Sequence, residues 1–181
     1  SHNIIGDRSY SSNKIIINKI GNLSIKLFNK NRIATVIKHI PGHGLSKKDT
    51  HLSLPYIDKK LSYLKKNDFS LFKNKKTLFA MTAHIVYVSI DKRDCITLSK
   101  KGIDYIRDKI GFKNLIISDD ISMKALQYSF EENVQKAYRA GCNLVLHCNA
   151  NMSEMIKLAK ISPKIDKLII KKTSEFYKLL S

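Results

Sequence analysis

The chain has 181 residues, 43% of them hydrophobic, which is enough to bury one core and too short for two domains of ordinary size. No apolar run reaches the length of a transmembrane helix, and the sequence does not open like a signal peptide. Three cysteines without motif spacing (Cys95, Cys142 and Cys148) suit free thiols in a reducing compartment rather than a disulfide framework. We therefore expect a single domain over residues 1–181, no membrane partner and a cytoplasmic location.

The formal charge of +18 raises the alternative of a protein that binds nucleic acid through phosphate contacts. Only five of the 33 basic residues are arginine, and the lysines are spread along the chain rather than gathered in one segment. No nucleic-acid-binding motif with interleaved aromatic residues accompanies them. The charge therefore predicts a solvated basic surface, and we expect no nucleic-acid partner.

The first part of the chain predicts a helix and then a strand that leads into polar residues. A turn at residues 6–8 places Arg8 where its guanidinium could clamp a hydroxyl group or an anion. Apolar residues at helical spacing predict a helix over 13–29. The short β-branched run at 33–37 predicts a buried strand, which is followed by the segment KHIPGHG at 38–44.

The rest of the chain alternates between helical segments and short apolar strands, and each strand ends in polar residues. Strands are predicted at 78–81, 114–117 and 143–146. Helical segments are predicted at 57–72 with a break near Asp68, at 99–110, at 130–140, and at 153–180 with a break at Pro163. The polar residues that follow the three strands are Thr82 and His84, then Asp119 and Asp120, then His147. Glycines at 111 and 141 are expected to end two of the helices.

This alternation of strands and helices predicts a parallel sheet whose polar strand ends meet at one edge. An open doubly wound sheet and a (β/α)8 barrel of the TIM type both satisfy the pattern. A complete barrel takes about 250 residues, so this chain would supply an incomplete one.

Residues 38–51 place three histidines, Lys38 and Asp49 around a Pro-Gly-x-Gly core. Proline and glycine favour an irregular loop, and such a loop can present polar groups at the end of a strand. Two alternatives stay open. The segment could be a basic surface loop whose histidines have no function, or His39, His43 and His51 could bind zinc, although no CxxC or HExxH spacing accompanies them.

Asp119 and Asp120 are adjacent at a strand end, where successive side chains point in opposite directions. We therefore expect the two carboxylates to have different roles. We expect Asp119 to face a cavity, and Asp120 to cap the turn or helix that follows.

Taken together, KHIPGHG at 38–44, DTH at 49–51, MTAH at 81–84 and ISDDISM at 117–123 give the chain a resemblance to family three glycoside hydrolases. More narrowly, it resembles the bacterial β-N-acetylhexosaminidases of peptidoglycan recycling. The resemblance runs from residue 4 to about residue 149. It implies a (β/α)8 barrel of the TIM type, cytoplasmic in Gram-negative relatives, that releases N-acetylglucosamine from muropeptides by retaining hydrolysis without a cofactor or a catalytic metal.

The same resemblance implies roles for six residues. Asp119 matches the nucleophile, His51 the general acid and base, and Asp49 the partner of that histidine. Arg8, Lys38 and His39 match residues that hold the hydroxyl and N-acetyl groups of the sugar. These residue types suit a retaining glycosidase, which needs a nucleophilic carboxylate and a second group that donates and then accepts a proton.

The chain departs from the family in one respect, since nothing in it corresponds to the first strands of the family's barrel. We expect a fragment, a split-gene product, or a chain completed by a missing N-terminal barrel segment or by a second copy of itself. A half barrel would have two open sheet edges. The alternative function is a catalytically inactive remnant that retains sugar contacts through Arg8, Lys38 and His39.

Overall fold

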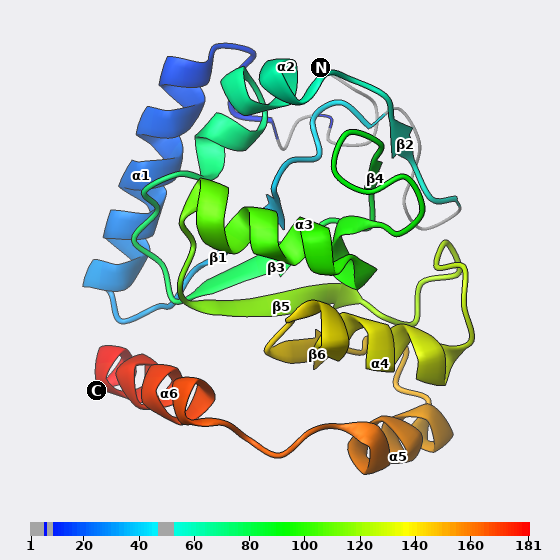
Figure 1. The fold of residues 1–181 in the computed structure, drawn as a ribbon. Helices are drawn as coiled ribbons and strands as arrows, with labels where there is room; N and C mark the ends of the chain where they lie inside the picture. The colour runs from blue at the N-terminus through cyan, green and yellow to red at the C-terminus, as the bar shows by residue number, and fades with distance from the viewer. Residues whose placement is uncertain (1–5, 7–8, 47–52) are drawn as a thin grey trace.

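The computed structural model describes residues 6, 9–46 and 53–181, and Figure 1 shows how their helices and strands are arranged. The strands are β1 (Val36–Ile40), β2 (Tyr56–Ile57), β3 (Phe79–Thr82), β4 (Val86–Tyr87), β5 (Leu115–Asp120) and β6 (Leu144–Leu146). The α-helices are α1 (Lys14–Lys30), α2 (Leu61–Lys66), α3 (Lys100–Tyr105), α4 (Phe130–Ala140), α5 (Met152–Ile161) and α6 (Lys167–Leu180). Short 3-10 turns cover Phe69–Phe72 (η2) and Ile96–Leu98 (η3), and a π turn (η4, Ile106–Ile110) extends α3.

The central sheet contains four parallel strands in the order β1-β3-β5-β6. These strands therefore lie side by side in the order in which the chain reaches them. A barrel has this sequential order, whereas a doubly wound sheet reverses direction at a switch point. The predicted parallel sheet is confirmed, and its order favours an arc of a barrel over a doubly wound sheet.

Two predicted boundaries need correction. Lys38 and His39 lie inside β1 rather than in a loop, because the strand begins and ends three residues later than the apolar run suggested. The pairing of β1 with β3 is irregular between Ile37 and Ile40, so these two polar residues occupy a distorted stretch of the strand. The helical segment predicted over 57–72 begins later, at Leu61, because Ile57 belongs to the unforeseen pair of strands β2 and β4. The break predicted near residues 67–68 is confirmed, since it separates α2 from η2.

Local sequence explains where the helices begin and end. The side chains of Asn13, Ser99, Ser129, Asn151 and Asp166 accept backbone N–H groups at the first turns of α1, α3, α4, α5 and α6. Gly111 and Gly141 follow the π turn and α4 with φ angles of 85° and 114°, the left-handed conformation that glycine adopts most readily. The predicted glycine stops are thus confirmed.

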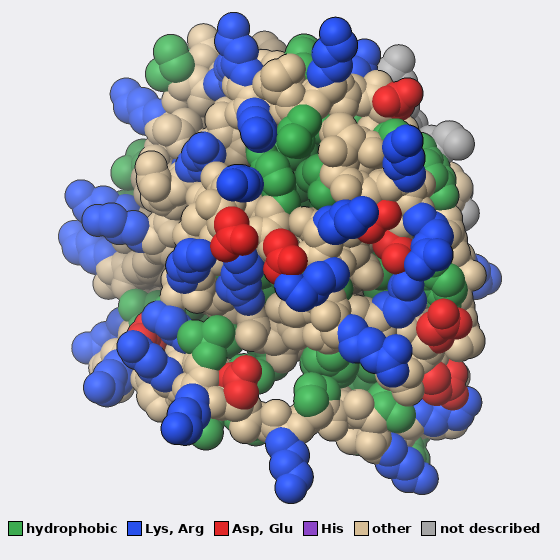
Figure 2. All heavy atoms as spheres, in the orientation of Figure 1, with side chains coloured by type: hydrophobic (Ala, Val, Ile, Leu, Met, Phe, Trp, Pro, Cys, Tyr) green, Lys and Arg blue, Asp and Glu red, His purple; other side chains and the backbone are tan. Residues whose placement is uncertain are grey.

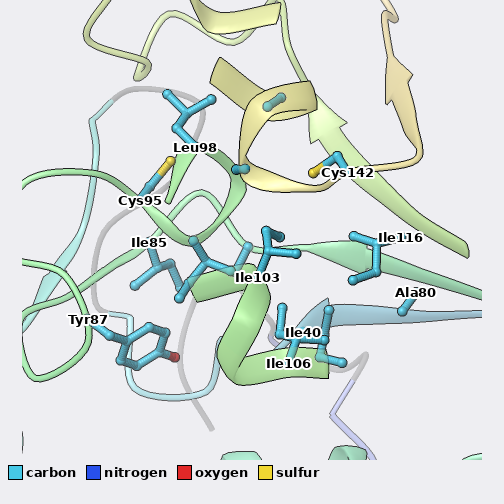
Figure 3. Packing of buried hydrophobic residues seen from close by; sticks show 14 of the residues in the cluster. Ile40, Ala80, Ile85, Tyr87, Cys95, Leu98, Ile103, Ile106, Ile116 and Cys142 are labelled. Atoms are coloured by element: carbon cyan, nitrogen blue, oxygen red, sulfur yellow. The ribbon is translucent and has the colours of Figure 1, made fainter. Parts of the chain in front are cut away.

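The core lies between the sheet and the helices that cover one of its faces. Figure 3 shows Ile40, Ala80 and Ile116 of three neighbouring strands close to Ile103 and Ile106 of α3 and its π turn. All five side chains are almost completely buried. This packing fixes the strands relative to one another, and with them the polar residues at the strand ends.

In the part of the chain that the structure describes, β1 and β6 each pair with one strand only, so both edges of the sheet are open. An apolar groove of about 550 Å³ lies beside β1 and is lined by residues of α1, β1 and η2. Ile33 and Val36 at this edge are about half exposed. The open edges agree with the half barrel expected from the sequence.

Basic side chains are dispersed over the surface. Figure 2 shows lysine and arginine scattered across one whole face, with acidic side chains among them and no single basic patch. This distribution agrees with the predicted solvated basic surface. Among the described residues, no helix is both long enough and apolar enough to cross a membrane.

Candidate active site

Three neighbouring strands bring polar side chains together at their carboxyl ends. Lys38 and His39 lie near the end of β1, Thr82 ends β3, and Asp119 and Asp120 end β5. The Nε2 atom of His39 is 3.7 Å from Oδ2 of Asp119, and the two side chains are 24% and 15% exposed. The predicted edge of polar strand ends therefore exists. At this edge a histidine of β1 faces a carboxylate of β5, with β3 between the two strands.

The two aspartates at the end of β5 have different surroundings. Asp120 accepts hydrogen bonds from the backbone N–H of Ser122 at 3.0 Å, from the Ser122 hydroxyl at 2.7 Å and from the backbone N–H of Cys148 at 3.1 Å. Its carboxylate thereby holds the turn after β5 against the segment after β6. Asp119 accepts the N–H of Asp120 through Oδ1 at 2.9 Å, while Oδ2 lies toward His39. These contacts agree with the expected division of roles.

The His39 imidazole is neutral at pH 7. Burial lowers its pKa to about 4; the Asp119 carboxylate opposes this shift, and the charges of His43 and Lys38 add to it. The contact between His39 and Asp119 is therefore not an ion pair at neutral pH, and 3.7 Å is too long for a good hydrogen bond. Both groups retain hydrogen-bonding capacity toward a ligand.

The segment that follows β1 is anchored on Asp68, a residue that the sequence suggested only as a helix break. Its carboxylate accepts backbone hydrogen bonds from Gly44 and Leu45, and its burial raises its pKa. The Tyr87 hydroxyl donates to the carbonyl oxygen of Gly42 at 3.0 Å. A Cβ atom on Gly42 would lie 2.8 Å from Asp68, so this close approach requires a glycine.

The Gly-x-Gly pattern was a sign that another group approaches the backbone closely. Nothing in the sequence identified that group, because Asp68 lies 24 residues beyond Gly44. The ring of His43, between the two glycines, is tilted against that of His39 with centroids 5.1 Å apart. Both histidines and Lys38 line a wide groove of about 1070 Å³ that opens to solvent.

Three of the six predicted site residues lie outside the described part of the chain: Arg8, Asp49 and His51. Lys38, His39 and Asp119 are described, and the structure brings the last two together. The segment that leads to Asp49 and His51 leaves the anchored loop at Ser46, which is buried.

Two other histidines at strand ends do not face the groove. His84 is completely buried; its Nδ1 is 2.8 Å from the Thr97 hydroxyl and its Nε2 is 3.0 Å from the carbonyl oxygen of Asp120. His147 is 2.8 Å from the carboxylate of Glu154 in α5. The strand-end pattern predicted polar residues at this edge of the sheet, but not which way their side chains point.

The described residues contain no group of three or more His, Cys, Asp or Glu side chains placed to hold a metal ion. The zinc alternative, formed by His39, His43 and His51, involves a residue outside the described ranges.

Comparison with known proteins places this geometry in a family. The model of the glycosyl hydrolase family 3 N-terminal domain matches residues 1–175. A β-hexosaminidase of Actinobacillus pleuropneumoniae is 34% identical over 156 residues, which cover 80% of this chain and 44% of the relative. A β-hexosaminidase of Photobacterium profundum is 31% identical over 191 residues, covering 97% of this chain and 55% of the relative. The chain spans about half the length of the curated relatives it matches.

Solved structures agree with the sequence comparisons. The β-N-acetylglucosaminidase of Thermotoga maritima is 32% identical, with a TM-score of 0.75 over 98% of this chain and 41% of its own. NagZ of Neisseria gonorrhoeae, in complex with N-trifluoroacetyl-D-glucosamine, is 26% identical, with a TM-score of 0.85 over 97% of this chain and 52% of its own. The arc of strands described above is therefore the fold of these proteins, and the predicted barrel class is confirmed.

Proposed function

Because the chain belongs to glycosyl hydrolase family 3, we propose that it carries the catalytic centre of a β-N-acetylhexosaminidase. The proposed reaction is the retaining hydrolysis of terminal β-N-acetylglucosamine from muropeptides derived from peptidoglycan, in the cytoplasm. The observation that carries the proposal is the Asp119 carboxylate at the end of β5, with one oxygen 3.7 Å from His39 beside an open groove.

Asp119 has the surroundings that a nucleophilic carboxylate needs. One oxygen is held by the backbone N–H of Asp120, which fixes the orientation of the side chain. The other lies toward His39, where the anomeric carbon of a sugar in the groove would approach it. In a retaining mechanism this oxygen forms a covalent glycosyl intermediate, which water then hydrolyses.

Lys38 and His39 are proposed to hold the sugar. A neutral imidazole can donate one hydrogen bond and accept another, which suits hydroxyl groups, and the lysine ammonium donates only. Both side chains line the groove beside the proposed nucleophile. The Neisseria relative was solved with an N-acylated glucosamine, which supports the same class of sugar as the ligand here.

His51 and Asp49 are proposed as the acid and base pair, with Arg8 as a further sugar contact. A histidine that titrates near neutrality can protonate the leaving oxygen in the first step and deprotonate water in the second. An adjacent carboxylate stabilises the imidazolium that forms between the steps. The anchoring of Gly44 and Leu45 on Asp68 supports this assignment, because it holds the start of the segment that carries both residues beside His39.

The open edges of the sheet support a completed barrel as the active form. We propose that an N-terminal barrel segment or a second copy of the chain covers β1 and the apolar groove beside it. The alternative function, an inactive remnant that binds N-acetylglucosamine, is favoured by the same open edges.

The test is the release of nitrophenol from p-nitrophenyl N-acetyl-β-glucosaminide, by the chain alone and by a version completed with the first barrel strands of a relative. We expect turnover that Asp119→Asn and His51→Ala abolish. Asp108→Asn changes an exposed carboxylate that pairs with Lys113, before β5 begins, and serves as the matched control.

Two outcomes would contradict the proposal. One is an absence of turnover from both folded forms, and binding of N-acetylglucosamine without turnover would then favour the remnant. The other is full activity in Asp119→Asn.

A further inference from the structure

We propose that Thr82, Thr97 and His84 form a buried hydrogen-bonded chain that positions the Asp119 carboxylate for attack on the substrate. The proposal rests on the function proposed above and adds three positioning residues to it. None of the three lines the groove, so each would act through Asp119 and its neighbouring backbone.

The hydrogen-bonded chain connects three segments of the sequence: residues 82–84, Thr97 and residues 119–120. The backbone N–H of Asp119 donates to the Thr82 hydroxyl at 3.3 Å, and that oxygen is 2.8 Å from the Thr97 hydroxyl in η3. The Thr97 hydroxyl is 2.8 Å from Nδ1 of His84, and Nε2 of His84 is 3.0 Å from the carbonyl oxygen of Asp120. The hydrogen bonds thus begin at one aspartate and end at the next.

The groups at the two ends of the hydrogen-bonded chain determine which atom donates in each of its hydrogen bonds. A backbone carbonyl only accepts, so Nε2 of His84 carries the proton that it donates to Asp120. A neutral ring then accepts at Nδ1, so Thr97 donates to His84 and Thr82 donates to Thr97. The Thr82 hydroxyl thus receives one hydrogen bond, from a backbone N–H, and gives one. The Thr97 hydroxyl shares its proton between Nδ1 of His84 and the carbonyl oxygen of Ala83, which lies 3.2 Å away.

Burial makes this arrangement rigid. Thr82, His84 and Thr97 are each 0% exposed, so water does not compete for their hydrogen bonds. Breaking one bond would leave a buried polar group without its partner, which costs about 1–3 kcal/mol. The hydrogen bonds of Thr82, Thr97 and His84 therefore strongly favour one position of the backbone at residues 119 and 120.

The position of this backbone affects the orientation of the Asp119 carboxylate through one hydrogen bond. Oδ1 of Asp119 accepts the N–H of Asp120 at 2.9 Å, so the side chain is tied to the peptide that the buried chain holds. Oδ2 is then left toward His39, which lines the groove. Because a misplacement of about 1 Å can cost about 100-fold in rate, a fixed backbone here has a direct consequence for catalysis.

The kinetic test compares variants in whichever form of the enzyme turns over the nitrophenyl substrate. Thr82→Val keeps the shape of the side chain and removes the hydroxyl, and we expect kcat to fall about 10- to 100-fold while KM changes by less than about threefold. Thr82→Ser restores the hydroxyl and should recover most of kcat. Thr82→Val combined with Thr97→Val should cost little more than either alone, because both break one chain.

Thr77→Val is the matched control. Thr77 precedes the same strand at its other end, is 5% exposed, and donates its hydroxyl proton to the carbonyl oxygen of Thr35. Its loss should lower stability about as much as the loss of the Thr82 hydroxyl and leave kcat unchanged. Equal effects of Thr77→Val and Thr82→Val on kcat would overturn the proposal.

A measurement without substrate tests the hydrogen bonds themselves. Nitrogen-15 NMR of labelled histidine should show His84 with its proton on Nε2, and the Asp119 amide should exchange faster with solvent in Thr82→Val. A proton on Nδ1, or an unchanged exchange rate, would overturn the proposed chain. An absence of turnover from both the protein alone and its completed version would instead contradict the proposed function, and with it the catalytic purpose of these hydrogen bonds, whatever the NMR spectrum shows.

Discussion

The Nε2 atom of His39, which lines the groove, lies 3.7 Å from Oδ2 of Asp119 at the end of β5. The two residues come from strands that are separated by β3, and they are 80 positions apart in the sequence. Because the imidazole is neutral at pH 7, it does not act as a cationic partner of Asp119 at this contact. A negative oxygen that is oriented but not neutralised suits nucleophilic attack on an anomeric carbon.

The His39 imidazole should stay neutral down to about pH 5. Its pKa of about 4 in the folded chain lies below the ordinary value of 6.5, mainly because the ring is buried. In an NMR titration, we expect the His39 ring resonance to move near pH 4, and not between pH 6 and 7. A midpoint near 6.5 would show that the ring is solvated and would contradict the described site.

The same pKa shift predicts how stability depends on pH. Between pH 6.5 and 4 the unfolded chain binds a proton at His39 that the folded chain does not, so the free energy of unfolding falls as pH falls through this range. The loss attributable to His39 is at most about 3 kcal/mol. Urea unfolding at pH 7 and pH 4.5 should therefore show a smaller difference for His39→Gln than for the wild type.

Substitution of Asp119 should lower mainly kcat, and substitution of Asp120 should lower mainly the stability of the fold. We expect Asp119→Asn to lower kcat at least about 1000-fold with little change in stability, because the proposed nucleophile is lost. Asp120→Asn weakens the hydrogen bonds to Ser122 and to the Cys148 backbone and should cost about 1–3 kcal/mol. Kinetics and thermal unfolding of both variants check this, and a reversal of the two effects would refute the assignment of roles.

Gly42 and Gly21 should respond in opposite ways to alanine. At Gly42 a Cβ would lie 2.8 Å from the Asp68 side chain, so Gly42→Ala should cost about 1–3 kcal/mol through overpacking. At Gly21, inside α1, nothing lies within 4 Å of the added Cβ, and Gly21→Ala should stabilise the helix by about 1 kcal/mol. Denaturant midpoints of the two variants test whether Asp68 anchors the loop.

Arg107 should contribute to the free energy of unfolding and not to kcat. Its guanidinium donates to the carbonyl oxygens of Phe112 and Asn114 and to the side chain of Asn143, which also accepts the N–H of Ile116. These contacts lie where β5 and β6 begin, at the opposite end of the strands from Asp119. Arg107→Met should therefore lower the free energy of unfolding by about 1–3 kcal/mol with kcat unchanged.

The sequence predicted the repeated features of the fold. Short apolar runs with helices between them indicated the parallel sheet, and glycines 111 and 141 marked helix ends that the structure confirms. The strands β2 and β4 were missed because each has two residues, too few for a periodic pattern. The end of β1 was misplaced because Lys38 and His39 are polar residues inside a strand, which hydrophobic periodicity cannot detect.

The strand-end pattern predicted the place of the site, whereas the roles of its residues came only from a family motif. Asp119 and His39 came from the resemblance to a family, and the structure brings them together. Asp68 and Thr97 could not be found from sequence, since their roles depend on contacts with segments far along the chain. The roles of Arg8, Asp49 and His51 stay predictions.

The most direct test of the account is covalent labelling with a 5-fluoro N-acetylglucosaminyl fluoride, a substrate analogue whose glycosyl-enzyme intermediate hydrolyses slowly. Proteolysis and mass spectrometry then locate the attached sugar. The account predicts one N-acetylated fluorosugar on the peptide that contains Asp119, and none in Asp119→Asn. Attachment to another residue, or steady turnover of the nitrophenyl substrate without any adduct, would contradict Asp119 as the nucleophile.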